Sequence, residues 1–530
     1  MKSSTIRTFM SVHTWVGLAA GFCLFIAFYA GAVTIFHEEL LTWETASSRA
    51  RPVESTARAQ ALIEAVLKAH PQAKESFYLR LPSQHVPDLS LDWDEERKGG
   101  AEIEHHFRLN AAGQLEDVKP YSQLVDFIYR LHYSAGFPPS WGIYVLGAIC
   151  VLYGLALASG VIIYAPLFLK DLFALRIGKN IKRMWQDAHN AIGILSLPFH
   201  LMYAWSSAVL TLGVILLAPF QYMVFDGKLL NLVGADISAA ATPAASGVAA
   251  ATLPAAELLA AIQVAAPGME VETMVFHQHG DANAQLQAYG KIHQETVASQ
   301  AAVVLNASNG GVLRVVAPER YSAGTRFLRS LQALHFGNFG HAAVQWTYFI
   351  LGMAGAFLFY SGNLLWVEAR RKRQQQAQPR SGRLMAQATL GVCLGCVAGV
   401  SAVFVLSKLA PGELPLWEQR GYYAVFFACV AWAFARPPAR AAHELLTLCA
   451  VLTAAIPLAQ WQRSGSSPWQ ALLHGDGVIV GVAAVAIVFA ALYWKMARAV
   501  LQRGRHGDPH SVWSLQTPGA VEAGRRQEAA

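Results

Sequence analysis

The sequence has few charged side chains. They make up 14% of its 530 residues, against about 25% in a typical soluble protein. Hydrophobic residues make up 54%, and the excess of positive charge is small, with 41 Lys and Arg against 34 Asp and Glu. This composition argues against an ordinary soluble protein and against a nucleic-acid-binding protein, and it predicts a membrane protein.

Cysteine and cofactor-binding motifs are also scarce. The six cysteines all lie within apolar stretches and give no sign of a disulfide framework in an extracytoplasmic domain. No G-x-G-x-x-G motif follows a predicted strand, and no segment expected in the cytoplasm is long enough for a nicotinamide or flavin domain. If the protein carries electrons, a separate donor must therefore supply them.

Long apolar runs are what the sequence has instead. A membrane-spanning helix needs about 20 mostly apolar residues, and we predict about eight such helices. The first run is too long for a signal-peptide core and has no cleavage site before Glu38, so we expect it to be retained. The eight runs are residues 11–36, 141–167, 189–217, 343–367, 385–408, 421–436, 441–459 and 475–497.

Lys and Arg gather in every second connection between these runs. Because basic loops stay in the cytoplasm, we predict an inner-membrane protein of a bacterium with both termini cytoplasmic, surrounded by membrane lipid. The predicted organisation is a first helix within residues 1–37, an outer domain at 38–140, two helices within 141–217 around a basic loop at 168–188, a second outer domain at 218–342, a fourth helix at 343–367, a basic linker at 368–383, a four-helix extension at 384–500 and a cytoplasmic tail at 501–530.

The two outer segments resemble each other. Each begins with an apolar stretch at helical spacing, over residues 59–68 or 254–262, and Asn and Gly mark a hairpin turn near its end. We therefore predict two small α+β domains in the periplasm, the second preceded by an alanine-rich lead-in at 238–252. The predicted strands are residues 76–81, 89–93 and 103–109 in the first segment and 271–277, 285–289 and 301–305 in the second.

Histidines recur in an internal duplication. His13 opens the first predicted helix and His189 the third, each with a glycine four residues later. His132 and His335 precede the second and fourth helices, each between a leucine and an aromatic residue. The predicted orientation places His13 and His189 at the cytoplasmic face and His132 and His335 at the outer face, which gives one pair per face.

Such pairs have the chemistry to bind haem. Two neutral imidazoles from facing helices can hold one haem iron from opposite sides, which favours electron transfer over oxygen chemistry. The alternative is that each histidine is an interfacial polar residue at a helix end. His200 follows His189 by 11 residues, which on a straight helix is nearly the same face and about 16 Å deeper. His200 is either an additional ligand or the partner of a backbone carbonyl freed at Pro198.

Together these features resemble the PepSY-associated transmembrane helix family, which includes iron-regulated inner-membrane proteins and periplasmic ferric-siderophore reductases. The resemblance covers about residues 5–370. It implies PepSY-like outer domains and two b-type haems. The spacing of His200 leaves a third haem open. The resemblance further implies that the haem ligands are His13, His189, His132 and His335. The segments that carry it are His13 to Gly17, the first outer domain, Leu131-His132-Tyr133, Ala188-His189-Asn190 and Leu334-His335-Phe336.

The resemblance also implies an activity. It is that of an oxidoreductase which passes electrons from a cytoplasmic reductase or quinol to a ferric siderophore, or another ferric chelate, in the periplasm. Reduction releases the metal, because Fe(II) is softer than Fe(III) and is held less well by hard oxygen ligands. Tyr133, Phe137, Trp141 and Phe339 are candidates to contact the chelate, or else they pack at an interface.

Two other functions stay open. One is a non-catalytic membrane protein whose PepSY-like domains bind or inhibit a peptidase, with structural histidines. The other is a transporter of siderophore or iron, for which broken helices with polar residues at mid-membrane depth would be expected. No motif assigns a role to residues 384–500.

Overall fold

The computed structural model describes residues 3–45, 55–82, 88–96, 102–117, 123–167, 180–228, 240–292, 297–371, 378–410 and 417–516. By its internal contacts the chain divides into two compact units. We call residues 1–49, 122–212 and 347–530 the helical unit, and residues 50–121 and 213–346 the sheet unit. Each unit is described by itself.

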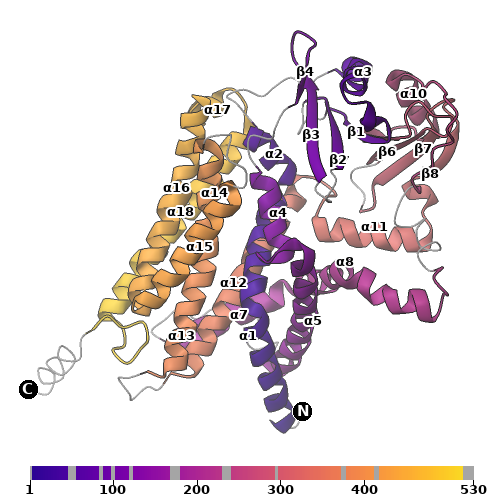
Figure 1. The fold of residues 1–530 in the computed structure, drawn as a ribbon. Helices are drawn as coiled ribbons and strands as arrows, with labels where there is room; N and C mark the ends of the chain where they lie inside the picture. The colour runs from indigo at the N-terminus through magenta and orange to yellow at the C-terminus, as the bar shows by residue number, and fades with distance from the viewer. Residues whose placement is uncertain are drawn as a thin grey trace, which may run out of the picture. The chain divides into compact units, whose positions relative to one another are not determined.

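The helical unit is built from long helices that pack side by side (Figure 1). It includes the first part of α8 and most of α12. The helices are α1 (Ser3–Thr34), α2 (His37–Thr45), α4 (Leu124–Ser134), α5 (Pro139–Tyr164), α7 (Ile181–Leu195), α8 (Leu197–Met223), α12 (Ala342–Ala369), α13 (Arg380–Thr389), α14 (Gly395–Leu409), α15 (Trp417–Ala435), α16 (Pro438–Ser464), α17 (Pro468–Leu473) and α18 (Gly477–His506).

Among the described residues, six helices are long and apolar enough to cross a membrane, and the bent pair α7–α8 makes a seventh if it is one span. The chain is therefore a multi-pass membrane protein. This is fewer than the eight spans we predicted, and the difference lies at residues 421–436. Helix α15 is present there, but its 19 residues begin with Glu418, Gln419 and Arg420 after Trp417, so its apolar part is shorter than that of the six candidate spans.

The run predicted over residues 189–217 is not one straight helix. Helices α7 and α8 meet at Ser196 with a bend of 70°. Pro198 stands in the first turn of α8, where its missing N–H costs no helical hydrogen bond. The bend overturns the straight-helix estimate that put His200 on the same face as His189 and about 16 Å deeper.

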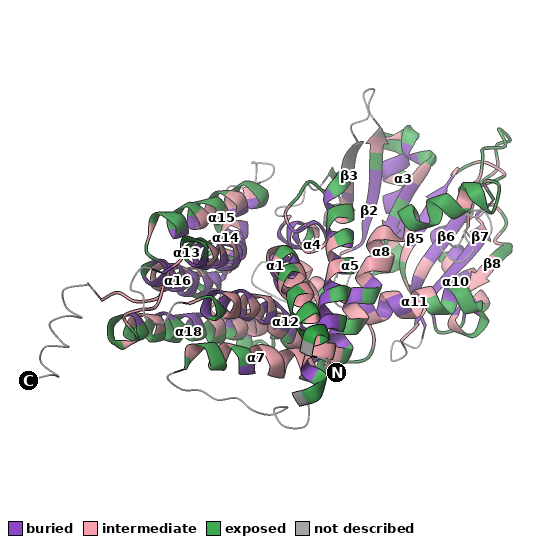
Figure 2. Ribbon diagram, turned by 90° about the horizontal axis from the view of Figure 1, so that it is seen from below, coloured by how far each residue is buried: buried purple, intermediate pink, exposed green. Residues whose placement is uncertain are grey.

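Helices α13 to α18 pack together, and their apolar core is continuous with that of α1, α4 and α5. Most residues of α14 are buried, whereas α18 has many exposed residues along its length (Figure 2). Apolar residues exposed in this way, such as Ile487, Val488 and Leu492, are the expected lipid-facing side of a membrane helix.

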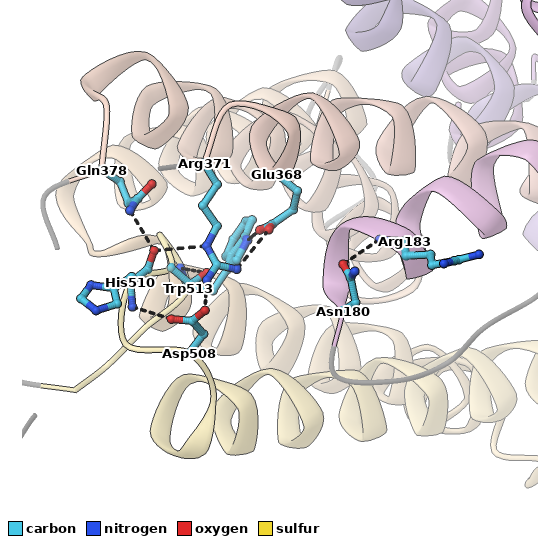
Figure 3. Close-up of polar contacts among 9 residues, drawn as sticks. Asn180, Arg183, Glu368, Arg371, Gln378, Asp508, His510 and Trp513 are labelled. Atoms are coloured by element: carbon cyan, nitrogen blue, oxygen red, sulfur yellow. Dashed lines mark hydrogen bonds and ion pairs between the residues drawn. The ribbon is translucent and has the colours of Figure 1, made fainter. Parts of the chain in front are cut away.

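The segment after α18 folds back onto the end of α12 (Figure 3). The indole Nε1 of Trp513 donates to Glu368 at 2.9 Å, and Arg371 donates to the carbonyl oxygen of His510 at 3.2 Å and pairs with Asp508. Gln378 donates to the same carbonyl oxygen at 2.8 Å. At least its part up to residue 516 is thus fixed to the membrane bundle.

The sheet unit contains one antiparallel sheet of eight strands, in the order β4-β3-β2-β1-β5-β6-β7-β8. Helices α3 (Ala59–Ala69) and α10 (Ala255–Ala265) contribute to the same apolar core as its strands. Figure 2 shows β6 and β7 largely buried. The strands are β1 (Ser76–Arg80), β2 (Ser90–Glu96), β3 (Glu102–Leu109), β4 (Leu115–Asp117), β5 (Glu270–His277), β6 (Gln285–Lys291), β7 (Gln300–Asn306) and β8 (Val312–Val316), and α11 (Ala323–Phe336) follows them.

The two outer segments thus share one sheet, where we predicted two separate small domains. The predicted helices and strands are all present, but β1 and β5 pair with each other, with Phe77 opposite Phe276 and their rings 4.8 Å apart. Each segment alone would leave its first strand as an open edge with unpaired backbone groups. Pairing closes both edges and joins the two apolar faces into one core.

The lead-in at 238–252 is described from residue 240 onward. The backbone N–H groups of Ser246 and Gly247 donate to the carboxylate of Asp281, at 3.0 and 2.9 Å. The hydroxyl group of Ser246 and the backbone N–H of Asn283 donate to the same carboxylate, and together with these two bonds they lower the pKa of Asp281 to about 2. The described part of this stretch is therefore attached to the sheet unit.

His105 gives the sheet unit a dependence on pH. Partial burial lowers the pKa of His105, but its hydrogen bonds to Asp117 at 2.8 Å and Glu95 at 3.4 Å outweigh this and leave the pKa raised. A raised pKa means that the protonated ring stabilises the fold below about pH 6.5 and that this contribution is lost as the pH rises through the folded-state pKa. We expect the melting temperature of His105→Gln to lie below that of the wild type at pH 5.5 and to approach it at pH 8.5. A difference that grows with pH would contradict this account.

Candidate functional site

The structure brings His13 and His189 together inside the helical unit. Their ring centres are 6.1 Å apart, and the ring planes are nearly perpendicular, at 79°. His13 lies on α1 and His189 on α7, so the pair joins the two helices related by the duplication. This is the pair we predicted from the repeat and the orientation.

Each of the two rings is fixed by a backbone carbonyl of a further helix. Nδ1 of His13 donates to the carbonyl oxygen of Ala156 on α5 at 2.8 Å, and Nδ1 of His189 donates to that of Leu358 on α12 at 3.1 Å. A ring whose Nδ1 carries the proton has its lone pair on Nε2. Such a second bond is the usual support of a metal-binding histidine.

Glycines make room for these rings. A Cβ atom on Gly160 would lie 3.0 Å from His13, and one on Gly362 would lie 3.1 Å from His189. Each glycine stands four residues after the residue whose carbonyl accepts the bond, one helical turn further along the same helix. On each helix, the carbonyl acceptor and the glycine therefore form one contact surface for the imidazole.

His132 on α4 has the same arrangement on α1. Its Nδ1 donates to the carbonyl oxygen of Ala27 at 2.8 Å, and a Cβ atom on Gly31 would lie only 2.6 Å from that nitrogen. Ala27 follows His13 by 14 residues, which is about 21 Å along a helix. His13 and the part of α1 that His132 contacts are thus separated by much of the roughly 30 Å thickness of a membrane core.

The separation of the His13 and His189 rings is that expected for two imidazoles on one haem iron. With metal–nitrogen bonds of about 2.0 Å, as in zinc–histidine sites, and about 1.15 Å from nitrogen to ring centre, two imidazoles on one iron have centres about 6.3 Å apart. The observed 6.1 Å matches this separation. Among the described residues no group of three or more His, Cys, Asp or Glu is placed to hold a metal ion. A haem needs only two protein ligands, because the porphyrin supplies the others.

His200 is fully buried, and a hydrogen bond of 2.5 Å joins its Nδ1 to the hydroxyl group of Tyr153 on α5. Its Nε2 has no hydrogen-bond partner among the described residues. The alternative in which His200 bonds a backbone carbonyl freed by Pro198 is therefore not what the structure shows. Its ring packs among those of Phe28, Tyr153 and Phe199.

His335 lies in the sheet unit, near the end of α11, and is buried. Among the aromatic candidates, Phe339 also belongs to the sheet unit and is half-buried. Phe137 and Trp141 belong to the helical unit, where their rings lie 5.1 Å apart and 36% and 46% of their surfaces are exposed. Tyr133 is half-buried, with its ring 5.3 Å from that of Tyr129.

Comparison with known families decides the relationship. Residues 10–369 match the family model described as the PepSY-associated TM region. The chain belongs to this family. All four repeat-related histidines and His200 lie within the matched residues. A Pseudomonas aeruginosa protein described as uncharacterized is 26% identical over 394 residues, which cover 71% of this chain and 95% of that protein.

The PepSY-associated TM region ends where α12 ends, so α13 to α18 are an addition to the family's matched part. Sequence reasoning found the histidines from their repetition, but it missed the carbonyl groups and glycines that the rings contact. A glycine four residues after a small or apolar residue is too common in membrane helices to be recognised as a contact site for a histidine. Tyr153, the partner of His200, also carried no recognisable signal.

Proposed function

We propose that this protein is a di-haem electron-transfer protein that reduces a ferric chelate on the outer side of the membrane. The observation that carries the proposal is the His13–His189 pair, with each Nδ1 bonded to a backbone carbonyl and the ring centres 6.1 Å apart. A half-buried imidazole pair within a membrane bundle is costly without a function. Binding one haem iron between the rings gives the pair that function.

In this proposal His13 and His189 hold an inner haem, and the duplication in the sequence assigns His132 and His335 as ligands of an outer one. Haem iron with two histidine ligands supplies one-electron transfer and has no open coordination position. The chain's own contribution is to fix the imidazoles, through the carbonyls of Ala156, Leu358 and Ala27 and the glycines one turn further on. His200 is the candidate for an additional ligand, because its Nε2 is buried without a partner among the described residues.

The electron donor and acceptor follow from the chemistry. A cytoplasmic reductase or membrane quinol would donate at the end that holds His13 and His189. A ferric siderophore or similar chelate would accept in the periplasm, where reduction to Fe(II) weakens its binding to hard oxygen ligands. The exposed rings of Phe137 and Trp141 offer an apolar surface at the start of α5 on which such a chelate could rest.

Vesicles test the proposed activity. The purified protein is placed in liposomes with a reductant sealed inside and a ferric chelate with a coloured ferrous product outside. We expect ferrous product to form at least about tenfold faster than in protein-free liposomes, and His189→Ala to fall to the background rate. Equal rates with and without the wild-type protein would contradict the proposal.

One observation favours a second candidate, an iron or siderophore transporter. The α7–α8 pair is a span broken by 70°, with the buried polar side chain of His200 just after the break. Broken helices at mid-membrane depth often form transporter binding sites. Uptake of a radiolabelled ferric chelate into liposomes without any reductant would support transport, and reduction without uptake would support the first proposal.

A further inference from the structure

The bundle added after the family's matched part contacts the short helix that carries His132. Helix α4 has 11 residues, and its N-cap residue Gln123 makes no capping hydrogen bond with its side chain. Helices of this length are marginal alone, and their first backbone N–H groups need partners. All contacts described next lie within the helical unit.

Two buried carboxylates from distant parts of the chain supply these partners. Glu44, at the end of α2, accepts hydrogen bonds from the backbone N–H groups of Leu124 at 2.8 Å and Val125 at 3.2 Å. Glu418, in the first turn of α15, accepts one from the N–H group of Gln123 at 3.2 Å. Negative charge at a helix N-terminus is also favourable for the helix dipole. The start of α4 is therefore fixed from α2 and from the added bundle.

The added bundle also holds α2, and with it Glu44. Lys408 of α14 is buried, and its Nζ donates to the carbonyl oxygens of Trp43 at 2.5 Å and Glu44 at 3.0 Å. The same ammonium group lies 4.1 Å from the ring centre of Trp43. A cation on the last carbonyls of a helix satisfies unpaired acceptors and the negative end of its dipole. Lys408 thereby fixes the residue that caps α4.

The other end of α4 is held by α15. The hydroxyl group of Tyr423 donates to the carbonyl oxygen of Gly136 at 2.7 Å, just after Ala135 has taken a left-handed conformation to end the helix. Between the two ends, the buried ring of Phe127 packs 5.2 Å from that of Tyr422. Helix α15 thus contacts α4 before its first residue, along its length and after its last.

From these contacts we infer that the C-terminal bundle positions α4, and through it sets how His132 binds the outer haem. Glu418, Tyr423 and Lys408 are positioning residues, since each acts through α4 or α2 and none contacts the imidazole in the contacts described. The inference rests on the proposed function, in which His132 is a haem ligand. It gives the added helices a role in tuning the outer site.

The test is the double variant Glu418→Gln, Tyr423→Phe. It removes from α15 the charge that contacts the start of α4 and the hydroxyl group that contacts its end. Loss of a residue that holds a metal ligand in position commonly changes metal binding 10- to 100-fold. We expect redox titration of the full-length protein to show the outer haem's reduction equilibrium shifted about tenfold, or 59 mV for one electron. The inner haem's equilibrium should be unchanged. The single variant Tyr423→Phe should show a smaller shift of the same haem and serves if the double variant does not fold.

Glu444→Gln is the matched control. It removes a carboxylate of the same bundle that pairs with Arg436 at 3.1 Å and accepts a hydrogen bond from Trp432 at 2.7 Å. None of these three residues takes part in the contacts with α4 described above. It should leave both haems unchanged. If the wild type contains both haems and the double variant titrates as the wild type does, the inference is overturned and the proposed function stands.

A haem-free wild type would instead overturn the proposed function. Amide hydrogen exchange over residues 124–134 then tests by itself whether the C-terminal bundle holds α4 in place. Faster exchange in the double variant than in Glu444→Gln would support the holding role of the bundle, and equal exchange would overturn it.

Discussion

His13→Ala and His189→Ala are each expected to reduce the haem content of the purified protein from about two per chain to about one. The two rings lie 6.1 Å apart, so in the proposal each imidazole supplies one of the two protein ligands of the same iron. Removing one imidazole leaves the iron with one protein ligand in an apolar bundle. Haem per chain is measured by the pyridine haemochrome method, and both variants should also lose the transmembrane reduction of a ferric chelate.

His474→Ala is the control for this pair. His474 is exposed, and its Nδ1 bonds only to Gln470 of its own short helix among the contacts described, so its loss should change neither haem content nor activity. A loss of both haems in His13→Ala with normal folding would show that the two sites are not independent. Full haem content in His13→Ala and His189→Ala would show that these residues are not ligands.

Gly31→Ala is expected to remove the outer haem and spare the inner one. The added methyl group would lie 2.6 Å from Nδ1 and 2.7 Å from Cε1 of His132, closer than packed atoms approach. The ring must move, and it then loses its bond to the carbonyl oxygen of Ala27. We expect about one haem per chain and loss of ferric-chelate reduction of about tenfold or more.

Gly481→Ala provides the comparison on α18, away from the four repeat-related histidines in the sequence. A Cβ atom on Gly481 would meet nothing within 4 Å, so this variant changes helix propensity in the same way without touching a histidine. It should keep both haems. Equal haem content in the two glycine variants would mean that the close packing of His132 on Gly31 is not needed for binding the outer haem.

Much of the fold could be predicted from the sequence, because the patterns that specify it are local. The helical and strand runs of the outer segments were recognisable from their spacing, and β1, β5 and the two hairpins lie where they were expected. The pairing of β1 with β5 was not predictable, since the two strands are separated by nearly 200 residues of chain and no local signal chooses their register. The bend between α7 and α8 was also missed, because Pro198 is compatible with a helix start as well as with a kinked span.

For the candidate site, repetition predicted which histidines to examine. It could not show that the rings bond to carbonyls of Ala156, Leu358 and Ala27, because those acceptors are backbone atoms that any residue provides. Nor could it show that Glu418 and Glu44 converge on the start of α4, as these residues stand 374 positions apart in the chain (418 − 44) and follow no motif. Contacts of this kind depend on the packed bundle.

The most direct test of the central claim is the visible spectrum of the detergent-purified protein, recorded as isolated and after dithionite, with haem quantified per chain. The account predicts a b-type α-band that sharpens on reduction and about two haems per polypeptide. Three haems would indicate that His200 is a ligand as well. A colourless protein purified from haem-replete cells would contradict the account.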